Sequence, residues 1–154
     1  MKLIIDNYPL KSIKHIGEGM PMIGSSWDIK FFKIGGVDFD LNTIEHEILR
    51  KKFEEPRIHF AINCASISCP KLRNEAFESD RLNQQLEAQL KEFINNRDKN
   101  IINKAETKLS KIFSWFETDF TKTTTVKSII KQHHSAFNEE NEIQYLDYNW
   151  RLNE

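Results

Sequence analysis

Apolar and polar residues alternate with period two early in the chain, which predicts a β-hairpin. Residues 37–41 place apolar side chains at every second position with acidic ones between them, the pattern of a strand with one buried face. The glycine pair at 35–36 supplies the positive φ angles that a tight turn needs. Residues 28–34 and 37–41 are therefore predicted to form the two strands of the hairpin.

The next pattern predicts a helix that begins at Asn42 and ends before Pro56. Asn42 and Glu45 have the spacing of a capping box, and Leu41 is the flanking apolar residue. The proline sets the end because it cannot continue a helix. Residues 57–64 follow as a predicted strand, since they are rich in β-branched and aromatic side chains.

The second half of the chain predicts further helices separated by short strands. Its longest apolar stripe at helical spacing is formed by Leu82, Leu86, Leu90, Phe93 and Ile94. Residues 7–26 are rich in glycine and proline and predict a surface loop. The remaining predicted elements are a helix over 79–95, strands at 101–102 and 107–109, helices over 110–120 and 124–134, and a final strand over 143–150. Because strands and helices do not alternate regularly, we expect an α+β fold with a mostly antiparallel sheet packed by several helices.

Composition narrows the class of protein without revealing a function. The chain has 154 residues, of which 39% are apolar and 29% charged, and its formal net charge is −1. This length suits a single domain over residues 1–154. A near-neutral charge without a basic cluster argues against nucleic acid as a partner, and no apolar run is long enough to span a membrane.

The first residues do not have the pattern of an export signal. Met1-Lys2-Leu3-Ile4-Ile5-Asp6 reaches an acidic residue after three apolar ones, whereas the apolar stretch of a signal peptide has about 7–15 residues. The sequence as given therefore predicts a cytoplasmic protein, or an exported one if a leader has been lost.

The densest reactive segment is residues 59–70, which contains both cysteines of the chain. Pro70 suits the first position of a helix, so Cys69 is predicted at the helix N-cap, where the helix dipole would stabilise a thiolate. The alternative is a buried capping residue. Cys64 lies on the apolar face of the predicted strand, which favours a place in the core.

Histidine, asparagine and glutamate side chains near this segment are candidate partners of the thiol. His59 and Asn63 share a face of the predicted strand, so Asn63 can hold the imidazole near the sheet end. Glu45 faces the apolar side of its helix with His46 at the rim, and either can orient the Cys–His region. The alternatives are a structural histidine and a carboxylate satisfied by the capping box.

Metal and disulfide chemistry are further alternatives for the same residues. His46, His59, Cys64 and Cys69 have the donor types of a zinc site, but the chain has no second cysteine pair. A Cys64–Cys69 disulfide is expected if the protein lives in an oxidising compartment. We predict no bound metal or cofactor.

Several segments together resemble a known family. They are Asn7-Tyr8-Pro9-Leu10-Lys11-Ser12-Ile13, Leu41-x-x-Ile44-Glu45-His46-x-Ile48-Leu49-Arg50, Arg57-Ile58-His59-Phe60-Ala61-x-Asn63-Cys64-Ala65-Ser66-x-Ser68-Cys69-Pro70-x-Leu72-Arg73, Leu109-Ser110-Lys111-Ile112-Phe113-x-Trp115 and Tyr145-Leu146-Asp147-Tyr148-x-Trp150-x-Leu152-Asn153. These segments, spread over nearly the whole chain, resemble the DUF547 family, a domain of unknown function. The resemblance implies a papain-like or transglutaminase-like fold, and a helix that usually precedes the Tyr-Pro segment is expected to be missing.

Two classes of function follow from these residues. The first is a thiol-dependent hydrolase or acyl transferase, in which Cys69 is the nucleophile, His59 the base, and Glu45 or Asn63 the orienting group. The second is a non-catalytic module whose polar loop binds a peptide or small molecule. Its predicted binding residues are His46, Ser66, Ser68 and Arg73, and a structural zinc clip is a third alternative.

Overall fold

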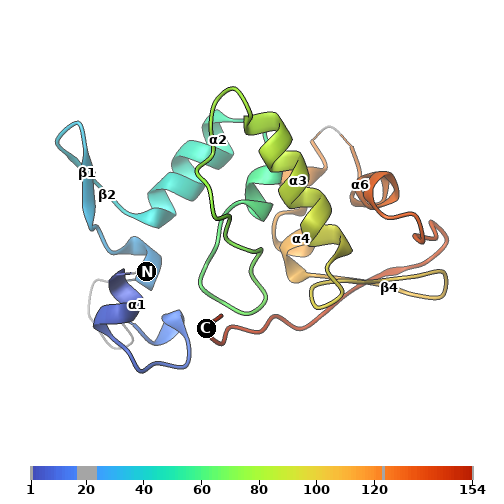
Figure 1. Cartoon of the computed structure of the whole chain (residues 1–154), viewed down its shortest axis with the longest axis horizontal. Helices are drawn as coiled ribbons and strands as arrows, with labels where there is room; N and C mark the ends of the chain where they lie inside the picture. The colour runs from blue at the N-terminus through green and yellow to red at the C-terminus, as the bar shows by residue number, and fades with distance from the viewer. Residues whose placement is uncertain (1, 17–23, 123, 154) are drawn as a thin grey trace. The chain divides into compact units, whose positions relative to one another are not determined.

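The computed structural model describes residues 2–16, 24–122 and 124–153 (Figure 1). Gly17, Gly19 and Pro21 of the predicted surface loop lie outside the described residues. The chain divides into two compact units. The first unit comprises Met1–Glu55, Cys64–Ile67 and Trp150–Glu154, and the second comprises Pro56–Asn63 and Ser68–Asn149. That the whole chain forms one domain stays a prediction.

The first unit contains the predicted β-hairpin in a shorter form. Strands β1 (Phe32–Ile34) and β2 (Val37–Phe39) pair antiparallel, with Phe32 opposite Phe39. Gly35 and Gly36 connect them with φ angles of 58° and 84°, which glycine adopts readily because it has no Cβ. The hairpin prediction is therefore confirmed.

The helix after the hairpin begins differently from the prediction. Asn42 already has helical backbone angles and makes no capping hydrogen bond, so the predicted Asn42–Glu45 capping box is wrong. Asp40 takes this role, because its carboxylate accepts hydrogen bonds from the backbone N–H (2.6 Å) and the hydroxyl (3.0 Å) of Thr43. The backbone hydrogen bond from Thr43 is the main cause that lowers the pKa of Asp40.

The other elements of the first unit are short helical segments. The capped segment is a π-helix, η3 (Thr43–Leu49), that continues into α2 (Arg50–Lys52). The remaining segments are α1 (Lys2–Asp6) and the 3-10 helices η1 (Ile13–His15) and η2 (Ser26–Asp28).

The second unit packs its helices around an aromatic core. Four phenylalanines form its centre, with ring centroids of Phe113 5.4 Å from those of both Phe60 and Phe120 and 6.3 Å from that of Phe93. Its helices are α3 (Leu82–Asn95), α4 (Lys111–Trp115), α5 (Glu117–Phe120) and α6 (Val126–His133). Figure 1 shows α3 as the long helix of this unit, and its buried stripe is the one that the sequence predicts.

The second unit also contains a three-stranded sheet with β4 in the middle. Strand β4 (Thr107–Leu109) pairs antiparallel with β3 (Ile101–Ile102) and parallel with β5 (Ile143–Tyr145). The side chain of Asn100, just before β3, joins the end of α3 to the residue after β4. Its amide donates to the Phe93 carbonyl (2.7 Å), and its oxygen accepts from the Ser110 backbone N–H (2.9 Å). The predicted α+β fold with mostly antiparallel strand pairing is confirmed.

The predicted strand over 57–64 is wrong. Its first residues form a 3-10 helix, η4 (Pro56–Phe60), and Ile58, His59 and Phe60 are all buried. A strand with one buried face would bury only alternate residues, whereas this segment packs against α3 on one helical turn.

Within the described residues, no helix is long and apolar enough to cross a membrane.

Candidate functional site

The two cysteines of the predicted reactive segment do not present thiols. Cys64 and Cys69 are both disulfide-bonded. Cys69 is only 4% exposed, and the Tyr148 hydroxyl lies 3.4 Å from its sulfur. The sulfur of Cys64 lies 3.3 Å from the hydroxyl of Ser66. In this oxidised state neither sulfur is a nucleophile, because that role requires a thiolate.

The helix predicted after Cys69 is absent, so the helix dipole does not act on its sulfur. Residues 70–77 contain no helix and no strand, and the chain bends at Asn74 and Glu75. Side chains from elsewhere satisfy the backbone of this segment: Asn63 donates to the Pro70 carbonyl (2.8 Å), Gln89 to the Lys71 carbonyl (2.9 Å) and Gln85 to the Ala76 carbonyl (2.8 Å). These bonds replace the internal hydrogen bonds that a helix would form.

His59 is held by a partner that the sequence analysis does not include. Its Nε2 atom lies 2.9 Å from the carboxylate of Asp119, and its ring stacks on Phe116 with a centroid distance of 3.8 Å. The His59 side chain is 1% exposed and that of Asp119 is 14% exposed. Asp119 comes from α5, 60 positions along the chain, so only the nearby aromatic residues Phe116 and Phe120 hint that its carboxylate faces the interior.

The predicted loop serines have hydroxyls engaged within the fold. Ser66 is fully buried and bridges to Leu152. Ser68 accepts a hydrogen bond from the Asn149 backbone N–H at 2.9 Å and donates its own backbone N–H to the Asn149 carbonyl at 3.2 Å. Both serines therefore anchor the chain near its C-terminal end.

The predicted residues on η3 belong to the first unit. His46 is half-buried, and one of its ring nitrogens lies 2.9 Å from Nη1 of Arg50, which can donate to it. Glu45 is half-buried, and its backbone carbonyl accepts from the N–H of Arg50. Among the described residues, no group of three or more histidine, cysteine, aspartate or glutamate side chains is arranged to hold a metal ion.

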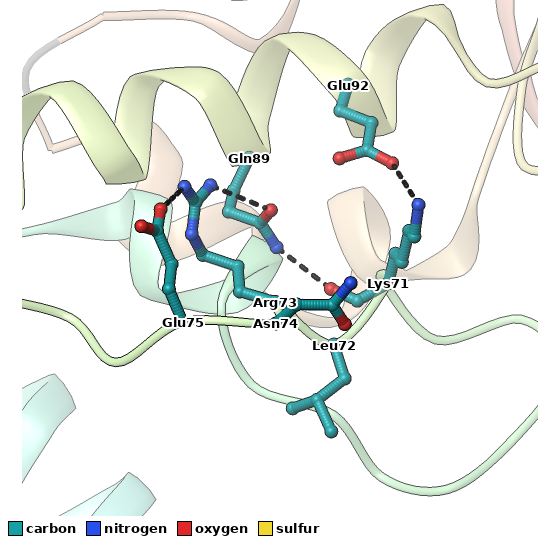
Figure 2. Close-up of a pocket in the computed structure, with 7 residues that line it drawn as sticks. All are labelled: Lys71, Leu72, Arg73, Asn74, Glu75, Gln89 and Glu92. Atoms are coloured by element: carbon teal, nitrogen blue, oxygen red, sulfur yellow. Dashed lines mark hydrogen bonds and ion pairs between the residues drawn. The ribbon is translucent and has the colours of Figure 1, made fainter.

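Arg73 lines an open pocket in the second unit. The pocket has a volume of about 330 Å³ and lies between α3 and the loop segment Lys71–Glu75. Figure 2 shows Gln89 and Glu92 projecting from α3 toward this segment, while Leu72 points away from the helix. The pocket therefore combines one wall from a rigid helix and one wall from a loop.

Two buried glutamines of α3 hold the loop wall in place. Gln85 and Gln89 are 3% and 4% exposed. Gln89 donates to the carbonyls of Lys71 and Phe60, at 2.9 and 3.0 Å. Gln85 donates to the carbonyl of Ala76 and accepts from the backbone N–H of Glu78. Buried polar groups with complete hydrogen bonding define one conformation, so this wall is preorganised.

The charges of the pocket are paired across its walls. The guanidinium of Arg73 contacts Glu75 and donates to the side-chain oxygen of Gln89 at 3.3 Å. Lys71 faces Glu92 at 3.9 Å. Hydrogen bonds from Arg73 and then Gln85 lower the pKa of Glu75, so this carboxylate is ionised at neutral pH. The Nε atom of Arg73 is buried without a hydrogen-bond partner among the described residues.

One residue of this pocket was predictable from the sequence, and the residues that hold its walls were not. Arg73 is a predicted binding residue, whereas Lys71, Glu92 and the two glutamines are not. A glutamine on a helix is expected to face solvent. The sequence signal for these two buried residues is their spacing, which places Gln85 and Gln89 beside the apolar stripe of α3.

Comparison with known proteins gives a family and no activity. No curated protein and no solved structure matches this chain. The family described as "Protein of unknown function, DUF547" matches residues 1–94, which include the cysteine segment, Arg73 and both glutamines of α3. The segments around Trp115 and Trp150 lie outside this match. Because the match covers more than half of the chain, this protein belongs to the DUF547 family.

Proposed function

We propose that this domain is a non-catalytic binding module that holds a peptide or small molecule in the Arg73 pocket. The observation that carries the proposal is the fixed loop wall: buried Gln85 and Gln89 hold the backbone of the segment that presents Arg73. A preorganised wall lowers the cost of ordering on binding. The volume of about 330 Å³ lies at the lower end of the range for small-ligand sites.

The charges support a ligand with polar groups of both signs. Lys71 and Arg73 can donate to a carboxylate or a peptide carbonyl, whereas Glu75 and Glu92 can accept from an amine or a peptide N–H. Asn74 adds an amide that can do both. A short peptide with a free amine and a free carboxylate has this combination of groups, so it fits the pocket better than an ion of one sign.

The oxidised cysteines support this class of function over a thiol enzyme. A nucleophilic Cys69 requires a reduced protein, and in the structure both cysteines are disulfide-bonded. One variant distinguishes the binding module from the thiol enzyme. Replacing both cysteines by serine leaves binding in the Arg73 pocket unchanged if the module is non-catalytic, whereas a thiol hydrolase or transferase would lose all turnover.

The disulfide bonding of Cys64 and Cys69 also supports the proposal that this protein functions in an oxidising compartment. Disulfides persist in secreted and periplasmic proteins and are rare in the cytosol. We expect a thiol reagent to label neither cysteine in the native or the unfolded protein, provided that the protein was isolated without reductant. Labelling of both cysteines after unfolding would contradict this proposal.

Nuclear magnetic resonance with tetraglycine as probe tests the binding proposal. This peptide carries a free amine, a free carboxylate and peptide groups without side chains. We expect saturable shifts of the backbone amides of Lys71–Glu75 and of Gln89, and much weaker shifts from tetraglycine that is acetylated and amidated at its ends. Arg73→Lys removes the planar guanidinium fork, and should weaken binding by about fivefold or more.

The control separates an effect at the pocket from a general effect of replacing an arginine by lysine. Arg97 is exposed in the same unit, outside the pocket, so Arg97→Lys should bind tetraglycine as the parent chain does. The proposal fails if the shifts do not saturate, if they map to other residues, or if Arg73→Lys and Arg97→Lys bind equally well while both remain folded.

A further inference from the structure

A second pocket lies in the first unit and shares no lining residue with the Arg73 pocket. It has a volume of about 1030 Å³ and is formed by three separate segments of the chain, around Leu10, Ile67 and Leu152. This volume lies at the upper end of the range for small-molecule sites. The segment that includes Tyr8, Pro9 and Lys11 is one that the sequence analysis singles out and that the Arg73 pocket leaves unexplained.

Main-chain hydrogen bonds join the three segments that form this pocket. The backbone N–H of Leu152 donates to the Lys11 carbonyl at 3.0 Å, and that of Ile67 donates to the Arg151 carbonyl at 2.8 Å. Ser66 and Leu152 form an antiparallel bridge beside them. Because backbone atoms make these links, the positions of the segments do not depend on flexible side chains.

The first segment is also fixed on its other side. Ser12 is buried and caps η1 by accepting from the Lys14 backbone N–H at 3.3 Å. The hydroxyl of Ser26 lies 2.6 Å from the Ile13 carbonyl and 2.7 Å from the Ile16 carbonyl. These contacts hold η1, which presents His15 to the pocket.

The lining of the pocket carries charge of one sign. Lys11, His15 and Arg151 line it, and none of the described lining residues is an aspartate or glutamate. Lys11 and Arg151 contribute basic side chains that can only donate hydrogen bonds, and the imidazole of His15 can donate a further one. The Arg73 pocket is different, because two glutamates, Glu75 and Glu92, are among its lining residues.

Apolar side chains form the rest of the lining. Leu10, Ile67 and Leu152 contribute aliphatic surface, with Pro9 and the ring of Tyr8 beside them. Aliphatic walls favour a hydrocarbon group through the hydrophobic effect, and basic side chains favour an anion through charge-assisted hydrogen bonds. One ligand satisfies both demands only if it joins an anionic head to an apolar body.

We propose that this pocket binds an amphipathic small molecule with one carboxylate on a hydrocarbon body. The carboxylate lies among Lys11, His15 and Arg151, and the hydrocarbon lies against Leu10 and the other aliphatic side chains. A purely apolar ligand would make no use of the basic side chains that line the pocket. A small inorganic anion would leave the aliphatic walls uncovered.

Binding of decanoate to the full chain tests this site. We expect saturable shifts of the amides of Leu10, Lys11, Ile67 and Arg151 in a nuclear magnetic resonance titration below the micelle concentration. Decanol has the same hydrocarbon without the charge and should bind about tenfold more weakly, since it loses the charge-assisted hydrogen bonds. Acetate has the charge without the body and should give no saturable shifts in the same range.

Variants of the exposed residue Lys11 test whether its positive charge contributes to decanoate binding. Lys11→Gln should weaken decanoate binding by about three- to tenfold, and Lys11→Arg should restore it. Lys33→Gln is the matched control, because Lys33 is exposed on the β-hairpin of the same unit and does not line the pocket. It should bind decanoate as the parent chain does.

Each other outcome overturns the proposal. Equal binding of decanol would show an apolar surface without a role for the basic groups, and equal binding of acetate would show an anion site without a role for the aliphatic walls. Shifts confined to Lys71–Glu75 would place the ligand in the Arg73 pocket. If Lys11→Gln is folded and binds decanoate as well as Lys33→Gln does, the carboxylate does not lie at the assigned position.

Discussion

The two compact units of the chain are stabilised by different kinds of buried side chain. In the second unit four phenylalanines pack ring against ring, with Leu90, Ile94, Leu109 and Ile130 around them. In the first unit the buried aliphatic residues Ile13, Ile16 and Leu152 share the interior with Ser12, Ser26, Asp40 and Ser66. The second unit therefore depends more on apolar burial, and the first depends more on hydrogen bonds to its backbone.

The difference explains what kind of site each unit presents. The second unit has a long helix, α3, whose buried Gln85 and Gln89 hold the loop segment Lys71–Glu75. The helix and this loop together form the Arg73 pocket. The first unit has short elements tied by main-chain bonds, and several of its large apolar side chains, such as Phe31, Val37 and Phe53, stay exposed. It presents apolar surface next to basic groups because its small core does not cover that surface.

The largest expected effect is on the aromatic core. Phe113→Ala removes a fully buried ring that contacts three other rings. Truncating a buried phenylalanine costs about 3–5 kcal/mol in the free energy of unfolding. Urea denaturation measures this change, with Ser114→Ala on the exposed side of α4 as the control. A loss below about 1 kcal/mol would contradict the dominance of ring packing in the second unit.

A buried polar residue of the second unit should rank next. Asn100→Ala removes the oxygen that accepts from the Ser110 backbone N–H and one of the two donors to the Phe93 carbonyl, which keeps the N–H of Asn96. An unsatisfied buried group costs about 1–3 kcal/mol. Amide hydrogen exchange should show faster exchange at Ser110 and in the last turn of α3, whereas the exposed Asn95→Ala should leave exchange at Ser110 unchanged. Equal exchange in both variants would show that Asn100 is replaceable.

The elements predicted well from the sequence are those whose pattern is local. The apolar stripe of α3 and the glycine pair of the hairpin each depend on residues within one element. The segment 57–64 is different, because a short apolar run fits a strand and a buried helix equally well. Packing against α3 decides it, and neither the spacing nor the β-propensity of Ile58 and Phe60 contains that information.

The candidate site was only partly predictable for the same reason. Arg73 follows from its place in a polar segment, but Gln85 and Gln89 are recognised as its supports only once the loop segment lies across α3. His59 and Asp119 are 60 positions apart in the chain, so no spacing rule joins them. The sequence analysis weighs a disulfide for the two cysteines, and both are disulfide-bonded. What it could not predict is the missing helix after Pro70.

A smaller, pH-dependent effect should appear in the first unit at Asp40. Asp40→Ala removes the cap of the helix at Thr43 and should cost about 0.5–2 kcal/mol at neutral pH. The pKa of Asp40 is lowered in the folded chain, so this carboxylate stabilises the fold above its unfolded pKa of about 4. That stabilisation is lost as pH falls through the folded pKa.

Denaturation at several pH values checks this sign. The difference in unfolding free energy between the parent chain and Asp40→Ala should shrink below about pH 4, since protonation removes the charge that accepts from Thr43. Asp147→Asn, at a fully exposed carboxylate, is the control and should show little change. A difference that grows toward low pH would contradict the assigned cap.

The smallest effect is expected at the tip of the hairpin in the first unit. Lys33 and Asp38 lie directly opposite each other across β1 and β2, with 2.7 Å between the ammonium nitrogen and a carboxylate oxygen. Their side chains are 61% and 51% exposed, so water and salt screen the pair. A double-mutant cycle with Lys33→Gln and Asp38→Asn should give a coupling of about 0.2–1 kcal/mol at low salt, falling toward zero in 1 M salt. A salt-independent coupling above 2 kcal/mol would mean that surface charge contributes to the first unit on the scale of its buried hydrogen bonds, and the contrast between the two units would then need a third kind of interaction.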